Sequence, residues 1–146
     1  MKITSSAFEH QQNIPAKYTC KGENINPPLQ FVDVPNNAKS LVLIVDDPDA
    51  PAGTWVHWVV FNILATNQIA EDSIPGVQGS NDFGKTNYGG PCPPSGTHRY
   101  FHKIYALDTV FKTSETFQKK ELENAMKGHI LDKAELVGRY KKESLW

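Results

Sequence analysis

The sequence predicts a mainly β fold, on three observations. Short apolar runs rich in Val and Ile recur along the 146 residues. The ten prolines and ten glycines gather between these runs, as turn residues do between strands. Only one segment has the apolar spacing of a helix. No repeat or linker divides the chain, so we expect residues 1–146 to form one domain.

The first two predicted strands lie in the N-terminal third of the chain. Residues 29–32 alternate weakly and stop at a Pro-Asn-Asn turn. Residues 39–45 are continuously apolar in their second half and rich in Val and Ile. Such a run predicts a strand that is buried on both faces.

Residues 54–63 form the next predicted strand. A strand places alternate side chains on opposite faces, so Trp55, His57, Val59 and Phe61 should share one face. Both faces are apolar, which again indicates a central strand.

The second half of the chain is predicted to contain a long loop, two strands and a helix. Residues 74–96 are rich in Gly and Pro, and their length favours an ordered functional loop. Residues 99–107 and 135–140 are predicted strands. Residues 116–127 should form an amphipathic helix that ends at Gly128.

Composition and charge exclude several function classes. The net charge of −1 gives no indication of a nucleic-acid or anionic-membrane partner, and no apolar run is long enough to span a bilayer. The first residues lack the apolar stretch of a signal peptide, so we expect a cytoplasmic protein. In that compartment Cys20 and Cys92 should both be reduced thiols.

Three aspartates follow directly on the buried strand at residues 39–45. Asp46, Asp47 and Asp49 cannot all be buried without partners, because each unpaired buried carboxylate would cost several kcal/mol. The neighbouring prolines would hold an inward-facing aspartate rigidly. A plain surface turn remains the alternative for this segment.

Polar side chains also gather on one face of the strand at 99–107. His98, Tyr100 and His102 share that face, and all three can donate hydrogen bonds. Arg99 lies on the other face and is a candidate partner for a spare aspartate. His57 alone would more often be an ordinary core histidine.

Together these residues predict a small polar pocket built from Asp47, His57, His98 and Tyr100. Imidazole and phenol donors beside a proline-fixed backbone suit a small anion such as phosphate or a carboxylate. A two-histidine, one-carboxylate metal site of Asp47, His57 and His98 is the alternative. No phosphate-loop, dinucleotide-binding, zinc-protease or serine-hydrolase motif is present.

Two longer motifs have an order and spacing that are highly specific. The first is Asp47-Pro48-Asp49-Ala50-Pro51 followed by Trp55-Val56-His57-Trp58. The second runs from Asp82-Phe83-Gly84-Lys85 through Tyr88-Gly89-Gly90-Pro91-Cys92-Pro93-Pro94 to Gly96-Thr97-His98-Arg99-Tyr100. On these motifs the chain resembles the phosphatidylethanolamine-binding protein family, in its short prokaryotic Raf-kinase-inhibitor-like branch.

The resemblance implies two antiparallel β-sheets, a large central one and a smaller one, with few peripheral helices. It implies that Asp47, His57, His98 and Tyr100 are the pocket's polar residues. It also implies that further residues line the cavity or hold its mouth, namely Ala50, Pro51, Trp55, Gly90 and Pro94. The implied ligand is a phosphate-type anion or phosphorylated head group, and a homodimer is an open alternative.

We therefore expect a non-catalytic anion-binding protein that needs no cofactor and no metal. A protein-interaction or inhibitory module acting on a kinase or protease is the first alternative, suggested by the long loop at 74–96. A hydrolase using Asp47, His57 and His98 is the second, with a histidine as general base. It lacks an evident nucleophile.

Overall fold

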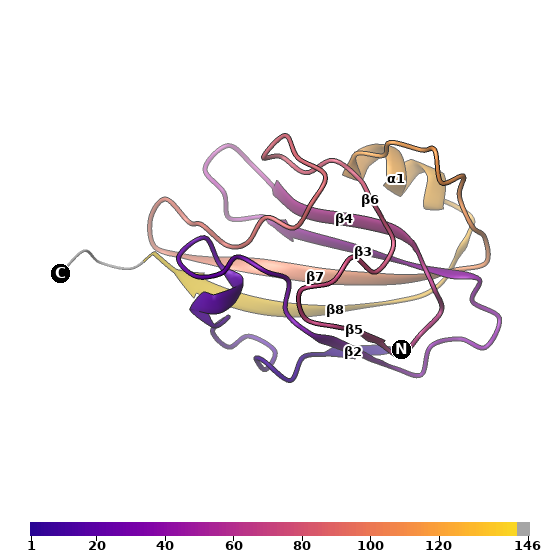
Figure 1. Ribbon diagram of the computed structural model, residues 1–146, viewed down its shortest axis with the longest axis horizontal. Helices are drawn as coiled ribbons and strands as arrows, with labels where there is room; N and C mark the ends of the chain where they lie inside the picture. Colours follow the sequence, from indigo (N-terminus) through magenta and orange to yellow (C-terminus); the bar gives the residue numbers. More distant parts are fainter. Residues whose placement is uncertain (143–146) are drawn as a thin grey trace.

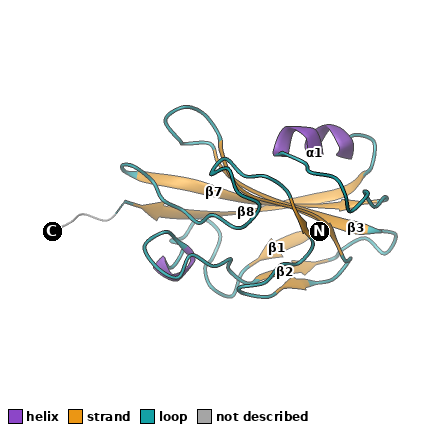
Figure 2. Ribbon diagram, turned by 45° about the horizontal axis from the view of Figure 1, so that its top comes forward, coloured by secondary structure: helices purple, strands orange, loops and turns teal. Residues whose placement is uncertain are grey.

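A five-stranded antiparallel sheet forms the middle layer of the molecule (Figure 1). The computed structural model describes residues 1–142. The larger sheet has the strand order β6-β4-β3-β7-β8, and a three-stranded sheet has the order β1-β2-β5. Figure 2 shows α1 on one side of the larger sheet and the smaller sheet on the other. The predicted fold of two antiparallel sheets is confirmed.

Long connections precede β2, β7 and α1, and the first of them contains the short helix η1. The bounds of the elements are β1 Lys2–Thr4, η1 Ala16–Tyr18, β2 Leu29–Val32, β3 Ser40–Asp47, β4 Trp55–Ile63, β5 Gln68–Ile69, β6 Val77–Gln78, β7 Thr97–Leu107, α1 Lys119–Met126 and β8 Ile130–Lys141.

Strand β3 lies at the centre of the larger sheet and separates two apolar cores. All eight of its residues are buried, as the continuous apolar run predicts. Leu41, Leu43 and Val45 contribute to the core between the two sheets. Val42 and Ile44 contribute to the core beneath α1. Beyond Val45 the same alternation sends Asp46 and Asp47 to opposite faces.

Strand β4 does not keep the alternation that the sequence predicts. Val45 pairs with Trp58 and Asp46 pairs with Val56, so His57 is an extra residue in a β-bulge. As a result Val59 and Phe61 lie beneath α1 with Val56, whereas Trp58 faces the core between the sheets. The prediction that His57, Val59 and Phe61 share one face was therefore wrong.

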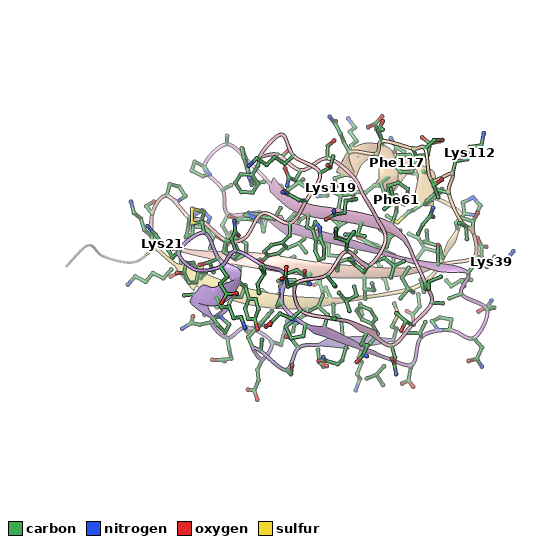
Figure 3. The ribbon with its side chains drawn as sticks, in the orientation of Figure 1. Lys21, Lys39, Phe61, Lys112, Phe117 and Lys119 are labelled. Atoms are coloured by element: carbon green, nitrogen blue, oxygen red, sulfur yellow. A yellow bond between two sulfur atoms is a disulfide. The ribbon has the colours of Figure 1, made fainter. Side chains whose placement is uncertain are left out.

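Helix α1 covers the face of the larger sheet opposite the smaller sheet. Leu122 and Met126 are buried against that face, and Gly128 follows the helix with a φ of 80°. The helix begins later than predicted because Phe117 is held in place by two contacts. Its ring packs on Phe61 with centroids 5.1 Å apart (Figure 3), and its carbonyl accepts a hydrogen bond from Ser80.

Strand β8 is longer than the predicted segment at 135–140. It pairs with β7 from Ile130 opposite Leu107 to Lys141 opposite Thr97. These pairs continue the sheet past the apolar residues that the sequence pattern could detect. Val137 and Tyr140, within the predicted segment, are buried.

Candidate functional site

A pocket of about 240 Å³ lies where β3 ends and β7 begins, beside the bulge of β4. It is lined by eleven residues from these strands, from the turn between β3 and β4 and from the loop that precedes β7. The lining residues are Asp47, Ala50, Pro51, Trp55, His57, Phe83, Cys92, Pro93, Pro94, His98 and Tyr100. All four predicted polar residues are thus brought together.

Asp47 and His98 form a close buried pair. Nδ1 of His98 lies 2.5 Å from Oδ2 of Asp47, and both residues are more than nine-tenths buried. The other carboxylate oxygen, Oδ1, accepts a hydrogen bond from the backbone N–H of Asp49 at 2.7 Å. Each carboxylate oxygen of Asp47 therefore has a hydrogen-bonding partner, and the contact with Oδ2 fixes the orientation of the His98 ring.

His57 enters the pocket because of the bulge in β4. Its Nδ1 lies 2.7 Å from the carbonyl oxygen of Gly89, which can only accept a hydrogen bond, so the Nδ1 hydrogen is assigned to this contact. Its ring packs edge-on against Phe83 and Tyr100, with centroids 5.3 and 5.2 Å away. Burial lowers the pKa of His57, although the Gly89 carbonyl and Asp47 oppose that shift.

The hydroxyl of Tyr100 is buried without a hydrogen-bond partner among the described residues. The backbone of Cys92 lies close enough to affect the pKa of this phenol, but it makes no well-formed hydrogen bond to it. Burial, together with the charges of Asp47 and Asp49, raises the pKa of Tyr100. The phenol is therefore neutral at ordinary pH and can donate its hydrogen to a ligand.

The rim of the pocket is apolar and rigid. Ala50, Pro51, Trp55 and Pro94 line it, as the resemblance implies. Gly90 is not among the lining residues. Its N–H donates to Oδ1 of Asn24 at 2.8 Å, and the backbone of Tyr18 lies directly against its Cα. Sequence reasoning did not assign Phe83, Cys92 and Pro93 to the lining.

The side chain of Asn81 holds the loop at 74–96 in its ordered shape. Its Oδ1 accepts the N–H groups of Phe83 and Lys85, each at 3.0 Å. Its Nδ2 donates to the carbonyl of Asn87 at 2.7 Å. The predicted loop is long and held by these contacts, but residues 77–78 within the predicted range form β6 of the larger sheet, and the sequence indicated neither β6 nor the role of Asn81. The only signal in the sequence is that Asn81 is an asparagine, a common turn residue, in a glycine-rich segment.

Cys20 and Cys92 form a disulfide, so the prediction of two reduced thiols was wrong. The bond ties the pocket wall to the loop that follows η1, at the end of the molecule where Lys21 lies (Figure 3). Both cysteines are exposed to solvent. The prediction assumed a reducing compartment, and disulfides persist mainly in oxidising ones. The cytoplasmic location stays a prediction, and the disulfide counts against it.

The three aspartates at the end of β3 and just after it have different partners. Asp49 accepts from the guanidinium of Arg99 at 2.9 and 2.8 Å, which confirms the predicted pairing outside the pocket. Buried Asp46 contacts Nζ of Lys103 and of Lys119 beneath α1. Only Asp47 turns into the pocket.

His102 lies on the same strand face as His98 but does not reach the pocket. Its Nδ1 lies 3.2 Å from the carbonyl of Tyr100 and 3.3 Å from that of Leu136. Its ring packs against Phe8. Burial lowers the pKa of His102 to about 4, so the ring is neutral in the core.

No three side chains of His, Cys, Asp or Glu within residues 1–142 are grouped so that they could hold a metal ion. In the same part of the chain, no helix has both the length and the apolar character that crossing a membrane requires.

The family model described as phosphatidylethanolamine-binding protein matches residues 4–141. The chain belongs to this family. Within it, the chain is 48% identical over 150 residues to a UPF0098 protein of Methanothermobacter thermautotrophicus, covering 97% of this chain and 99% of the relative. A UPF0098 protein of Chlamydia muridarum is 47% identical, with coverage of 98% and 100%. These relatives place the chain in the prokaryotic branch.

Solved structures agree with this family assignment. A phosphatidylethanolamine-binding protein homolog of Chlamydia trachomatis is 48% identical and superposes with a TM-score of 0.94, over 97% of both chains. YbcL of E. coli, described as a new member of the mammalian family, is 29% identical with a TM-score of 0.88. It covers 97% of this chain and 98% of its own.

Proposed function

We propose that the pocket binds a small phosphate-type anion or the phosphoryl group of a larger ligand, and that the chain is a non-catalytic binding protein. The observation that carries the proposal is the convergence of His57, His98 and the unpartnered Tyr100 hydroxyl in one small cavity. A buried donor without a partner is costly, and a bound acceptor oxygen would satisfy it.

The apolar rim supports the same function. Pro51, Pro93 and Pro94 fix the backbone around the opening, so little conformational entropy is lost when a ligand binds. The name of the family describes its members as binding phosphatidylethanolamine, whose head group contains a phosphoryl oxygen. The same chemistry could equally come from a free phosphate.

A thermal-shift titration tests the proposal. Phosphate at 100 times its Kd should stabilise the folded chain by about 2.7 kcal/mol, a rise in melting temperature of roughly 5–10 °C. The double variant His57→Ala/His98→Ala should lose this rise, whereas His129→Ala, on the exposed surface, should keep it. Equal responses to phosphate and to chloride at matched ionic strength would contradict the proposal. Phosphoethanolamine and free phosphate distinguish the two ligand sources.

The Asp47–His98 contact favours one second candidate, hydrolysis of a phosphoester with His98 as general base. A carboxylate on Nδ1 leaves Nε2 to accept a proton from water. Turnover of a phosphomonoester that disappears in His98→Gln would establish this activity. The absence of turnover in a chain that binds phosphate would leave the binding function alone. The protein-interaction alternative stays a prediction.

A further inference from the structure

The pocket contains no permanent positive charge. None of the eleven lining residues is Lys or Arg. Arg99 is adjacent to His98 in sequence, but its guanidinium is half-exposed and paired with Asp49. The lining does contain a carboxylate, that of Asp47. Positive charge for an anion can therefore come only from protonated imidazoles or from a proton that the ligand brings.

His98 cannot provide a net positive charge by itself. Its ring is paired with Asp47, so a protonated His98 only neutralises that carboxylate. The pair contributes a net charge of zero at most. The remaining histidine, His57, is the group whose protonation would make the pocket positive.

His57 presents the wrong atom to a fully deprotonated anion. Its hydrogen lies on Nδ1, in the contact with Gly89, and no described residue makes a hydrogen bond to its Nε2. In the neutral ring Nε2 is a lone-pair acceptor. Two acceptors, this nitrogen and an anionic oxygen, repel each other unless a proton lies between them.

The surroundings of His57 set its charge in the free chain. Asp47 and Asp46, both on β3, favour the protonated ring, while burial opposes it more strongly and lowers the pKa. On β7, neutral Tyr100 packs on the ring, His98 lies beside Tyr100, and His102 interacts with His57 from the core. The loop contributes the uncharged ring of Phe83. At neutral pH the imidazole is therefore uncharged.

We propose that this pocket binds its anion together with one proton, held between the ligand and Nε2 of His57. The matching chemical class is hydrogen phosphate or a phosphomonoester, which carries an ionisable P–OH group. Sulfate and phosphodiesters have no such hydrogen and can bind only when the ring itself takes a proton from solution. The inference rests on the proposed function and adds the protonation state of the ligand.

Isothermal titration calorimetry with phosphoethanolamine, a phosphomonoester, measures the proton directly. A phosphomonoester has a second pKa of about 6, so at pH 7.5 it has almost no P–OH hydrogen. Titrations at this pH in two buffers with different heats of ionisation should give enthalpies that differ by the heat of about one proton taken up. Inorganic phosphate brings its own P–OH hydrogen and should take up much less. Sulfate supplies a comparison of the same shape. An imidazole with the ordinary pKa of 6.5 is protonated in only about one molecule in ten at pH 7.5, and burial lowers this share. Sulfate should therefore bind at least about tenfold more weakly than phosphate, and its affinity should rise on acidification.

The variant His57→Gln separates this proton from one taken up elsewhere. A glutamine amide can place N–H hydrogens near the position of Nε2, so the variant should bind sulfate and phosphate with similar affinity and without proton uptake. Uptake that persists in His57→Gln would overturn the inference, because it would place the proton at His98. Phosphoethanolamine binding to the wild type without any proton uptake would overturn it too and leave the proposed function intact. Absence of phosphate binding would remove both.

Discussion

The buried histidine outside the pocket, His102, should make the folded state sensitive to mild acid. In the unfolded chain its imidazole has the ordinary pKa of 6.5, whereas burial lowers the pKa in the folded chain to about 4. Below pH 6.5 the unfolded chain therefore binds a proton that the folded chain does not. The free energy of unfolding must fall as the pH falls from 6.5 towards 4.

The size of this effect follows from the two pKa values. Each pH unit between them is worth about 1.4 kcal/mol, so the whole loss comes to about 3 kcal/mol. From pH 6.5 to pH 5 the expected loss is about 1.5 kcal/mol. The interval from pH 6.5 to 5 is informative because the carboxylates with lowered pKa values, Asp49, Glu71 and Asp132, take up protons mainly at more acidic pH. The lowered pKa of His57 adds a loss of the same sign.

Urea unfolding of the wild type and of His102→Gln at pH 6.5 and 5.0 isolates the contribution of His102. The buried Trp58 provides the fluorescence signal. Glutamine can still donate to the carbonyls of Tyr100 and Leu136 but does not titrate, so the variant should lose about 1.5 kcal/mol less than the wild type over this interval.

His129→Gln is the matched control for this experiment, because His129 is exposed and paired with Asp108 at the surface. Its unfolding at the two pH values shows how much a surface histidine alone changes the pH dependence, and His102→Gln is compared with it. If His102→Gln and the wild type lose the same free energy from pH 6.5 to 5.0, the reasoning about His102 is refuted.

Two further predictions concern the disulfide and the aspartates near the end of β3. The double variant Cys20→Ser/Cys92→Ser should lower the free energy of unfolding by about 2–4 kcal/mol, because the disulfide closes a long loop. Urea unfolding without reductant measures this loss, and an unchanged midpoint would contradict the prediction. Asp46→Asn should lower the melting temperature more than Asp49→Asn does, because Asp46 is buried between Lys103 and Lys119 while the Asp49–Arg99 pair is partly exposed. Equal shifts in the two variants would argue against this ranking.

Local patterns were sufficient for much of the fold. The apolar run at 39–45 identified the central strand because both of its faces are covered. The alternation of side chains along a strand correctly predicted that His98, Tyr100 and His102 share one face. It holds because β7 pairs with its neighbours without a register shift over residues 98–102. That Arg99 pairs with one of the spare aspartates was predicted from the sequence, whereas the structure identifies this aspartate as Asp49.

Other features depend on parts of the chain that are distant in sequence. The bulge at His57 exists only in the pairing of β4 with β3, and a strict alternation therefore assigned the wrong faces. The disulfide depends on the fold bringing Cys20 and Cys92 to a Cα separation of 5.5 Å, across 72 positions of sequence. The loop contacts of Asn81 likewise become visible only when the strands are in place.

The bulge also limits how this pocket can change during evolution. One extra residue in β4 turns His57 towards the pocket while Trp58, its neighbour, still enters the core between the sheets. Deleting that residue would remove the imidazole and force the remaining strand either to shift its pairing or to exchange its two faces. A lineage can therefore alter ligand preference by replacing side chains around the cavity, whereas changes of length within β4 would disrupt the core and the pocket together.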